Sequence, residues 1–182
     1  MVLKNQIRKK ILKIRRTKNS NLCEIDSNKL LKIIKKTKIK KVIIGCYYPV
    51  NSEINTKKIM KFFEKKKFII CLPIIKNNLD MEFYEYKAVD PLYVNKYGIP
   101  EPINKRKKKP NVLLIPIVAF DRKLNRLGYG GGFYDRFLEK MEKFKILKIG
   151  LAFSYQRIKN VPIEKFDKKL DYILTEKEIF TK

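Results

Sequence analysis

The sequence predicts an α/β fold: a single-domain, three-layer αβα arrangement with a mainly parallel, Rossmann-like sheet. Short, continuous apolar runs that suit strands covered on both faces alternate with segments whose apolar residues recur at helical spacing. Such alternation implies right-handed crossovers, which place helices on both faces of a parallel sheet. The chain of 182 residues is long enough for one sizeable core and short for two, so the domain is expected to span residues 1–182.

Four segments carry the helical pattern. In residues 3–16 the apolar side chains lie three or four positions apart, and Lys4, Arg8 and Arg15 then fall together on one border of the apolar stripe. Ser27 is a plausible N-cap for the second helix. The predicted helices are residues 3–16, a segment that begins after Asp26 or Ser27, residues 55–66 and a segment that follows the glycines at 128–132.

Five apolar runs predict buried strands, and an alternating stretch at 81–86 predicts an edge strand. Pro49 and Pro73 are expected to end the first two strands. Residues 95–111 contain three prolines, Gly98 and the cationic run Lys105–Lys109, which is typical of a surface loop. The predicted buried strands are residues 42–48, 68–72, 112–116, 146–153 and 172–174.

The charge is strongly positive, with 44 Lys and Arg against 18 Asp and Glu. One interpretation is a nucleic-acid-binding protein, because clustered cations gain affinity by releasing phosphate counterions. The other is a general enrichment in Lys, Ile and Asn without a partner. The lysines are spread over nearly every segment, and most aromatic residues lie in apolar runs rather than between cations. This pattern favours the second interpretation, so no specific nucleic-acid partner is expected.

The sequence contains no histidine and three cysteines without a CxxC spacing, which leaves little material for a zinc site and excludes Ser-His and Cys-His nucleophile pairs. Cys46 and Cys71 lie inside apolar runs, as buried structural cysteines do. No apolar run approaches the roughly 20 residues that span a bilayer, and Met1 to Arg16 lacks the pattern of a secretory signal. A cytoplasmic protein without membrane contact is expected.

The most unusual segment is Arg126-Leu127-Gly128-Tyr129-Gly130-Gly131-Gly132-Phe133-Tyr134-Asp135-Arg136. Four of the seven glycines of the chain fall within five residues here. The segment follows a buried strand and opens a helix, so its backbone N–H groups can converge on an anion. It lacks the Gly-Lys-Ser/Thr of a Walker A loop and the position of a dinucleotide fingerprint. A merely tight or flexible loop is the alternative, which the flanking Arg126, Asp135 and Arg136 weaken.

This string, preceded by Pro116 to Asp121, resembles the signature of the 5-formyltetrahydrofolate cyclo-ligase family. Further landmarks of the family occur in the same order along essentially the whole chain. They are Lys4 to Arg8 (K-x-x-L-R), Tyr48 to Glu53 with Thr56 (Y-x-x-x-x-E-x-x-T), Gly98 to Pro102 (G-I-x-E-P), and Asp167, Asp171 and Thr175-Glu176 near the carboxyl terminus. The family often has His before the first of those aspartates, where this chain has Phe166, so the resemblance implies no obligatory histidine there.

The resemblance implies an enzyme of one-carbon folate metabolism that acts as a monomer. ATP activates the formyl oxygen of 5-formyltetrahydrofolate, nitrogen 10 attacks, and 5,10-methenyltetrahydrofolate, ADP and phosphate leave. Phosphoryl transfer needs alignment and charge neutralisation more than a titrating base, so a chain without histidine can support it. The implied cofactors are ATP and Mg²⁺.

By the same resemblance, Arg126 and Tyr129 are catalytic, and Asp135 and Asp167 bind Mg²⁺. The residues implied to bind ATP are Lys4, Asn5, Gln6, Ile7, Arg8, Arg126, Leu127, Gly128, Tyr129, Gly130, Gly131, Gly132, Phe133 and Tyr134. The residues implied to bind folate are Tyr48, Glu53, Tyr129, Gly130, Gly131, Gly132 and Phe133.

The residues themselves leave plainer alternatives open. Lys4 and Arg8 suit a solvated cationic helix face, and Phe133 suits ordinary core packing. Asp135 lies in a first helical turn, where a carboxylate stabilises the helix. Asp167 could pair with a neighbouring lysine, and Glu53 could be a charge at a helix N-terminus.

Overall fold

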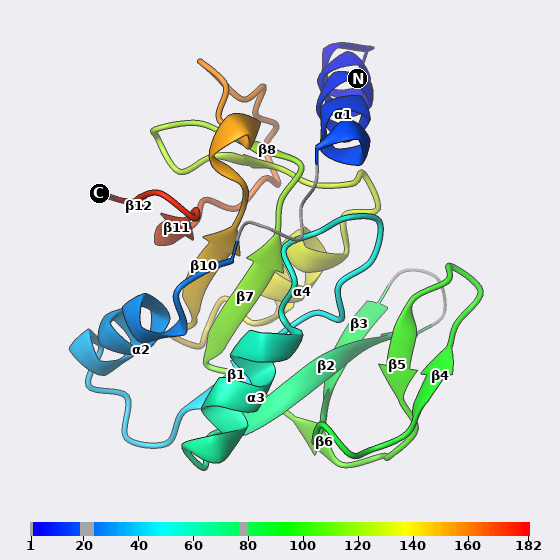
Figure 1. Ribbon diagram of the computed structural model, residues 1–182, viewed down its shortest axis with the longest axis vertical. Coiled ribbons are helices and arrows are strands. Elements are labelled where there is room, and N and C mark those ends of the chain that lie inside the picture. Colours follow the sequence, from blue (N-terminus) through cyan, green and yellow to red (C-terminus); the bar gives the residue numbers. More distant parts are fainter. Residues whose placement is uncertain (1, 19–23, 77–79) are drawn as a thin grey trace.

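A computed structural model describes residues 2–18, 24–76 and 80–182, and its centre is a sheet of mainly parallel strands (Figure 1). Five neighbouring strands are parallel, and antiparallel strands extend the sheet on both sides. In spatial order the strands are β12 (Ile179–Thr181), β11 (Tyr172–Leu174), β10 (Leu147–Leu151), β7 (Val112–Pro116), β1 (Ile43–Gly45), β2 (Ile69–Lys76), β3 (Asp80–Glu85) and β6 (Lys107–Lys108).

Helices cover both faces of this sheet (Figure 1). On one face, α2 (Ser27–Lys36) and α3 (Lys57–Lys65) bury Leu30 and Phe63 in the larger core cluster. On the other face, α4 (Phe133–Lys140) buries Phe137 and Leu138 in the second cluster. The predicted αβα layering is therefore confirmed.

Helix α1 (Val2–Thr17) lies beyond the carboxyl ends of the parallel strands (Figure 1). Its Ile11 packs in a third cluster with residues of β8 (Ala119–Phe120) and β9 (Arg126–Leu127), which form a hairpin. The buried carboxylate of Asp121 accepts hydrogen bonds from the Asn125 and Val161 backbone N–H groups and so fixes the turn of this hairpin. This arrangement places α1 against the segment that leads into the glycines.

Residues 95–111 are not simply a surface loop. They include β6 and also β5 (Pro100–Pro102), which pairs with β4 (Leu92–Val94) in a separate two-stranded sheet. Glu101 is buried, and its Oε1 accepts hydrogen bonds from the Ile75 backbone N–H at 2.9 Å and from Asn95 Nδ2 at 2.6 Å. Prolines are tolerated in β5 because an edge strand does not need every N–H group.

Proline likewise fails to end β2, which continues through Pro73 to Lys76. The pairing of β2 with β1 stops at Cys71, opposite Gly45, and beyond it Pro73 pairs only with Phe83 of β3. The missing N–H of Pro73 therefore costs no ladder hydrogen bond on the β1 side.

Three smaller expectations also differ from the structure. Strand β1 ends at Gly45, before the predicted boundary at residue 48. The N-cap of α2 is Asp26, whose side chain accepts a hydrogen bond from the Asn28 backbone N–H at 2.8 Å, and not Ser27. Strand β3 is covered by β6 and is not the outermost strand, and β12 was not predicted. Within the described ranges, no helix has the length and apolar character needed to cross a membrane.

Candidate active site

The glycine segment forms a turn between β9 and α4 with backbone conformations that favour glycine. Gly130 has a φ of 105° and Gly132 a φ of 66°, both in the left-handed region. Gly132 is the N-cap of α4 and makes no side-chain cap hydrogen bond. The first-turn N–H groups of a helix lack intrahelical partners, so a cap without a side chain leaves them open to an anion.

Two guanidinium groups flank this turn. Arg8 Nε donates to the Gly128 carbonyl oxygen at 2.8 Å, and Arg136 Nη2 donates to the Gly131 carbonyl oxygen at 2.8 Å. A Cβ at Gly130 would lie 3.5 Å from the guanidinium carbon of Arg8, which is an ordinary contact distance, so the φ of this residue and not the approach of α1 favours glycine here. Asn5 supports the position of Arg8, because its Oδ1 accepts from Arg8 Nη1 at 2.6 Å.

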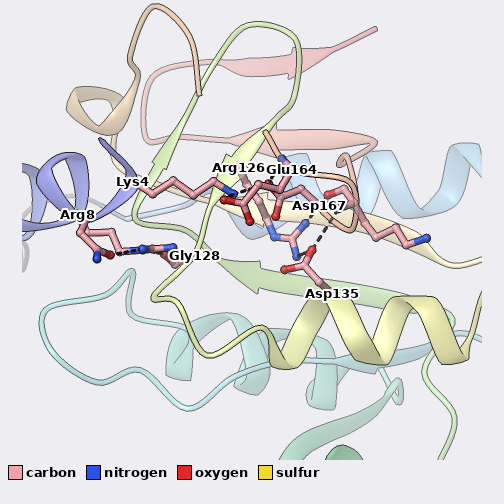
Figure 2. A network of polar contacts seen from close by, with 9 residues as sticks. Lys4, Arg8, Arg126, Gly128, Asp135, Glu164 and Asp167 are labelled. Carbon is pink, nitrogen blue, oxygen red and sulfur yellow. Dashed lines mark hydrogen bonds and ion pairs between the residues drawn. The ribbon is translucent and has the colours of Figure 1, made fainter. Parts of the chain in front are cut away.

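Two further cations engage the aspartates that sequence reasoning assigned to a metal (Figure 2). Lys4 Nζ lies 2.7 Å from Asp167 Oδ2 and 3.3 Å from Glu164 Oε1. Arg126 Nη2 lies 2.7 Å from Asp135 Oδ1, which also accepts from the Lys168 backbone N–H at 3.1 Å. Segment 164–168 thus links both pairs.

These contacts decide some of the alternatives. The Lys4 side chain is 9% exposed, so the interpretation of Lys4 as part of a solvated face is wrong. Asp167 pairs with Lys4, which lies 163 positions away in the sequence, and not with its lysine neighbours. Asp135 is more than a helix-terminus charge, because it neutralises an Arg126 side chain that is only 5% exposed.

The carboxylates suit Mg²⁺ only in company with phosphate. Among residues 2–18, 24–76 and 80–182, no group of three or more Cys, Asp or Glu side chains is placed to hold a metal ion by itself. Mg²⁺ usually takes one or two carboxylates and completes its shell with substrate phosphates and water. Asp135 and Asp167, which flank a cationic turn, fit that mode of binding.

A second group of side chains surrounds the buried carboxyl of Glu53. Burial raises the pKa of Glu53, whereas the Tyr129 hydroxyl, the Val50 N–H and the charge of Arg15 lower it in part. The Val50 N–H donates to Glu53 Oε2 at 3.0 Å. Burial also raises the pKa of Tyr129, so its phenol stays protonated at neutral pH, while the residue as a whole is 39% exposed. The hydroxyl is therefore enclosed although part of the residue is open to solvent.

The aromatic residues near this group differ in what they contact. Phe133 packs against the second core cluster and also lies edge-on to Tyr97, with ring centroids 6.4 Å apart. The core-packing interpretation of Phe133 is therefore confirmed, and its contact with a ligand stays a prediction. The Tyr134 hydroxyl is buried without a hydrogen-bond partner, and burial raises its pKa. An unpaired buried hydroxyl beside a candidate site is compatible with a polar group that arrives with a ligand.

Other predicted site residues have structural contacts or lie at the margin. Gln6 is exposed, Ile7 packs with the third cluster, and Leu127 is buried there. The ring of half-buried Tyr48 lies 4.7 Å from Lys57 Nζ. The Thr56 hydroxyl donates to the Tyr47 carbonyl oxygen at 2.7 Å.

The carboxyl-terminal family landmarks also include both structural residues and one residue of the candidate site. Asp171 Oδ2 accepts from the Lys148 backbone N–H at 2.8 Å, and Glu176 Oε2 accepts from that of Ser154 at 2.9 Å, so both carboxylates secure backbone elsewhere. Only Asp167 of this pattern joins the network, and the neighbouring Phe166 is 62% exposed.

Sequence reasoning missed Glu164, and it placed Arg15 on the same helix border as Lys4 and Arg8 without giving Arg15 a role in the site. Arg15 is 1% exposed and lies with its guanidinium carbon 5.4 Å from the centroid of the Tyr129 ring. A signal was available, because positions 4, 8, 11 and 15 fall on one face of a helix. Glu164 gives no comparable pattern in the sequence.

Comparisons with known proteins agree with this geometry. The sequence profile of the 5-formyltetrahydrofolate cyclo-ligase family matches residues 1–176. The 5-formyltetrahydrofolate cyclo-ligase of Haemophilus influenzae is 32% identical over 186 residues, covering 94% of this chain and 96% of the relative. That of Mycoplasma genitalium is 30% identical, covering 96% and 98%.

Solved structures give the same result. The 5,10-methenyltetrahydrofolate synthetase of Aquifex aeolicus superposes with a TM-score of 0.77 at 29% identity, over 98% of this chain and 92% of that one. The synthetase of Mycoplasma pneumoniae, at 23% identity and a TM-score of 0.75 over 96% and 99%, supports the fold. With a family profile that spans nearly all of its residues and relatives matched almost end to end, the chain belongs to the 5-formyltetrahydrofolate cyclo-ligase family.

Proposed function

We propose that this chain converts 5-formyltetrahydrofolate to 5,10-methenyltetrahydrofolate, using ATP and Mg²⁺ and releasing ADP and phosphate. The observation that carries the proposal is that α1 brings Arg8 to the glycine turn and Lys4 to Asp167, while Arg126 pairs with Asp135 at the end of the same turn. The names of the relatives describe the same conversion.

The cationic side of the site would hold the triphosphate. Arg8 and the N–H groups of residues 128–134 surround the space at the start of α4, where phosphate oxygens are favoured by both hydrogen bonding and the helix dipole. Lys4 and Arg126 supply further charge. Arg126 has five donors, and only part of this fork is used by Asp135 and the Lys168 carbonyl oxygen, so it can also contact the transferred phosphoryl group.

Asp135 and Asp167 are the residues that would hold Mg²⁺ beside those phosphates. A bound magnesium ion supplies charge neutralisation on the phosphate oxygens. The ion pairs with Arg126 and Lys4 orient both carboxylates before the nucleotide binds.

The folate would lie on the side of Glu53, Tyr129 and Phe133. The protonated Tyr129 phenol is a hydrogen-bond donor and not a base, because its pKa is raised by burial. Phe133 and Tyr48 offer flat rings to a pterin, and Glu53 offers a buried acceptor to its N–H donors. This arrangement orients the substrate so that its formyl oxygen faces the phosphate site. We further propose that the chain acts as one domain and as a monomer.

The assay is the conversion itself, followed as the rise in near-ultraviolet absorbance of the methenyl product. Purified protein with 5-formyltetrahydrofolate, ATP and Mg²⁺ is expected to give product and ADP in a 1:1 ratio, which follows from the proposed stoichiometry. Omitting ATP, or chelating Mg²⁺ with EDTA, should abolish the rise. ATP turnover that does not respond to the folate would contradict the proposal.

A further inference from the structure

Arg15 is a fully buried cation in the last turn of α1 that the proposed reaction does not use. It is 1% exposed, and its Nε has no hydrogen-bond partner among the residues that the structure describes. Its Nη2 donates to the Asn51 carbonyl oxygen at 2.8 Å, and its guanidinium carbon lies 5.4 Å from the centroid of the Tyr129 ring. Burying a guanidinium is costly even where a carboxylate and a phenol lie near it, as Glu53 and Tyr129 do here, which points to a role other than stability.

The turn that Arg15 contacts is strained. The Glu53 N–H donates to the Val50 carbonyl oxygen at 3.0 Å, and the two residues between them, Asn51 and Ser52, have φ values of 49° and 61°. Two consecutive positive φ angles in such a turn strongly favour Gly, Asn or Asp. Serine at the second position is therefore a poor choice for this turn, and such strain persists only where neighbouring contacts enforce it.

Those contacts come from two directions. The Val50 N–H donates to Glu53 Oε2 at 3.0 Å, which closes the turn from within. Arg15 holds the same turn from outside through Asn51, and its guanidinium also lies over the ring of Tyr129 in the glycine turn. One side chain thus joins α1, the turn at 50–53 and the glycine turn.

We propose that Arg15 is a positioning residue for the folate side of the site: it fixes the strained turn at 50–53 against Tyr129, so that Glu53 is held in its binding orientation. Lys4 and Arg8 on the same face of α1 serve the phosphate side. Helix α1 therefore sets the relative placement of the two substrates. Since Arg15 Nε is itself buried, the residue acts through Glu53 and Tyr129 and does not touch the substrate.

The inference rests on the proposed function for its kinetic consequence. Without Arg15 the turn relaxes, and only a fraction of the molecules keeps the turn conformation that binds folate. The apparent dissociation constant for folate then equals the intrinsic one divided by that fraction. Arg15→Met is expected to raise the KM for 5-formyltetrahydrofolate about tenfold, which corresponds to a competent fraction of about a tenth. The KM for ATP should change less than twofold, because Lys4, Arg8 and the glycine turn remain.

The experiment compares Arg15→Met and Arg15→Lys with Arg16→Met, a neighbouring cation that is exposed. Arg15→Lys keeps the charge but lacks the planar guanidinium group. It replaces Arg15→Met in the same measurements if the methionine variant does not fold. The second arm adds Ser52→Gly, which removes the strain from the turn. In the double variant Arg15→Met/Ser52→Gly, the KM for folate should return at least halfway to the wild-type value on a logarithmic scale.

Amide hydrogen exchange at Val50 and Glu53 gives a readout that does not depend on turnover. It should speed up in Arg15→Met, slow again with Ser52→Gly and stay unchanged in Arg16→Met. If the wild type shows no cyclo-ligase turnover, the proposed function fails while the exchange pattern still decides the positioning role. The inference would be overturned if Arg15→Met raised the KM for ATP as much as the KM for 5-formyltetrahydrofolate. It would also be overturned if exchange at Val50 and Glu53 were the same in the wild type and in Arg15→Met.

Discussion

Two cation-rich regions of this molecule have similar composition but differ in the burial and the ion pairing of their side chains. The first, which we call the site cations, comprises Lys4, Arg8, Arg15 and Arg126. The second is the run Lys105–Lys109 beside β6. In the run, the Arg106 and Lys107 side chains are each 55% exposed, whereas those of Lys4 and Arg126 are 9% and 5% exposed. The run has the higher density of positive charge in the sequence and the lower burial in the structure.

The pairing of the two regions differs as well. Arg106 and Lys108 lie within 4 Å of Glu85, and Lys107 pairs with Glu82, so the run is matched across adjacent strands by ordinary surface ion pairs. Such pairs contribute about 0–1 kcal/mol each. The site cations converge from α1 and β9 on one turn and lose much of their hydration there. Burial of charge, and not its density along the sequence, therefore marks the functional region.

The largest effect is expected from Arg126→Met. The change removes a buried cation and leaves Asp135 without its partner at 2.7 Å. By analogy with arginines that stabilise phosphoryl transfer, kcat should fall by about 10³-fold or more. Breaking a largely buried pair should also lower the free energy of unfolding by about 3 kcal/mol, discounted toward 2 because Asp135 is partly exposed. Steady-state kinetics and urea unfolding measure the two effects.

Arg122→Met is the matched control, because Arg122 lies in the same hairpin and is exposed. It should leave kcat within about twofold of the wild type and stability within about 0.5 kcal/mol. An Arg126 variant that kept near-normal kcat would remove Arg126 from the catalytic role and weaken the distinction between the two regions.

The next effect concerns the turn itself. Gly132→Ala forces a residue with a Cβ to a φ of 66° and places that Cβ 2.6 Å from Arg136 Nη1. The flexible Arg136 can move away, but it then loses its bond to the Gly131 carbonyl oxygen at 2.8 Å. We expect nucleotide affinity, measured by isothermal titration of ADP with Mg²⁺, to fall about tenfold, which is about 1.4 kcal/mol.

Gly98→Ala separates strain from binding. Gly98 has a φ of 74° and nothing within 4 Å of its would-be Cβ among the described residues, so the backbone penalty is similar and the added Cβ displaces no neighbouring side chain. Both variants should lose about 1–2 kcal/mol of stability, while only Gly132→Ala loses nucleotide affinity. A parallel loss of affinity in Gly98→Ala would mean that global destabilisation, and not the anion turn, explains the result.

The sequence predicted the architecture better than its edges, for identifiable reasons. Runs such as 112–116 are apolar on both faces and so reveal a central parallel strand directly. Strand β5 and the continuation of β2 through Pro73 could not be predicted, because proline is excluded only where a neighbour needs its N–H, and neighbours are a property of the fold.

In the site, too, residues within one stretch of sequence could be predicted, whereas contacts between residues far apart in the sequence could not. The glycine turn and Asp135 are visible in one stretch of sequence, and the resemblance added Lys4, Arg8 and Asp167. The pairing of Lys4 with Asp167 joins residues 163 positions apart. Helical spacing groups Arg15 with Lys4 and Arg8, but its burial comes from contacts with Asn51 and Tyr129, which lie far from it in the sequence.

A smaller effect follows from the buried carboxyl of Glu53. Burial raises its pKa above the ordinary value of 4.5, so the folded state favours the protonated form. Its contribution to stability is therefore fully present below pH 4.5 and is lost as the pH rises through the raised pKa. The wild type should lose stability relative to Glu53→Gln as the pH is raised from about 4 to about 7.5. The loss is about 1.4 kcal/mol for every tenfold difference in proton affinity between the folded and unfolded states.

Urea unfolding of both proteins at several pH values measures this difference. The Arg15→Met background should enlarge it, because the charge of Arg15 opposes the rise in the pKa of Glu53. A stability difference that does not vary with pH would show that Glu53 has an ordinary environment. Arg15 and Glu53 would then interact less strongly than the structure indicates.

The smallest effect is expected where the sequence is most basic. The triple change Arg106→Gln, Lys107→Gln and Lys108→Gln removes three exposed cations and leaves Glu82 and Glu85 without these partners. Because these are surface pairs, stability should fall by no more than about 1–2 kcal/mol in total. The KM values for ATP and folate should stay within about twofold, since the run contributes to the site only through the screened long-range field.

The same variant tests the nucleic-acid interpretation of the charge. If the run only adds to a general positive field, binding of single-stranded RNA by the wild type should weaken steeply with salt, and the triple variant should lower both the affinity and the salt slope modestly. Sequence-selective binding at physiological salt that the triple variant abolishes would give the run a function of its own. That result would mean that exposed cations mark a functional region as well as buried cations do. The difference in burial between the two regions argues against this result.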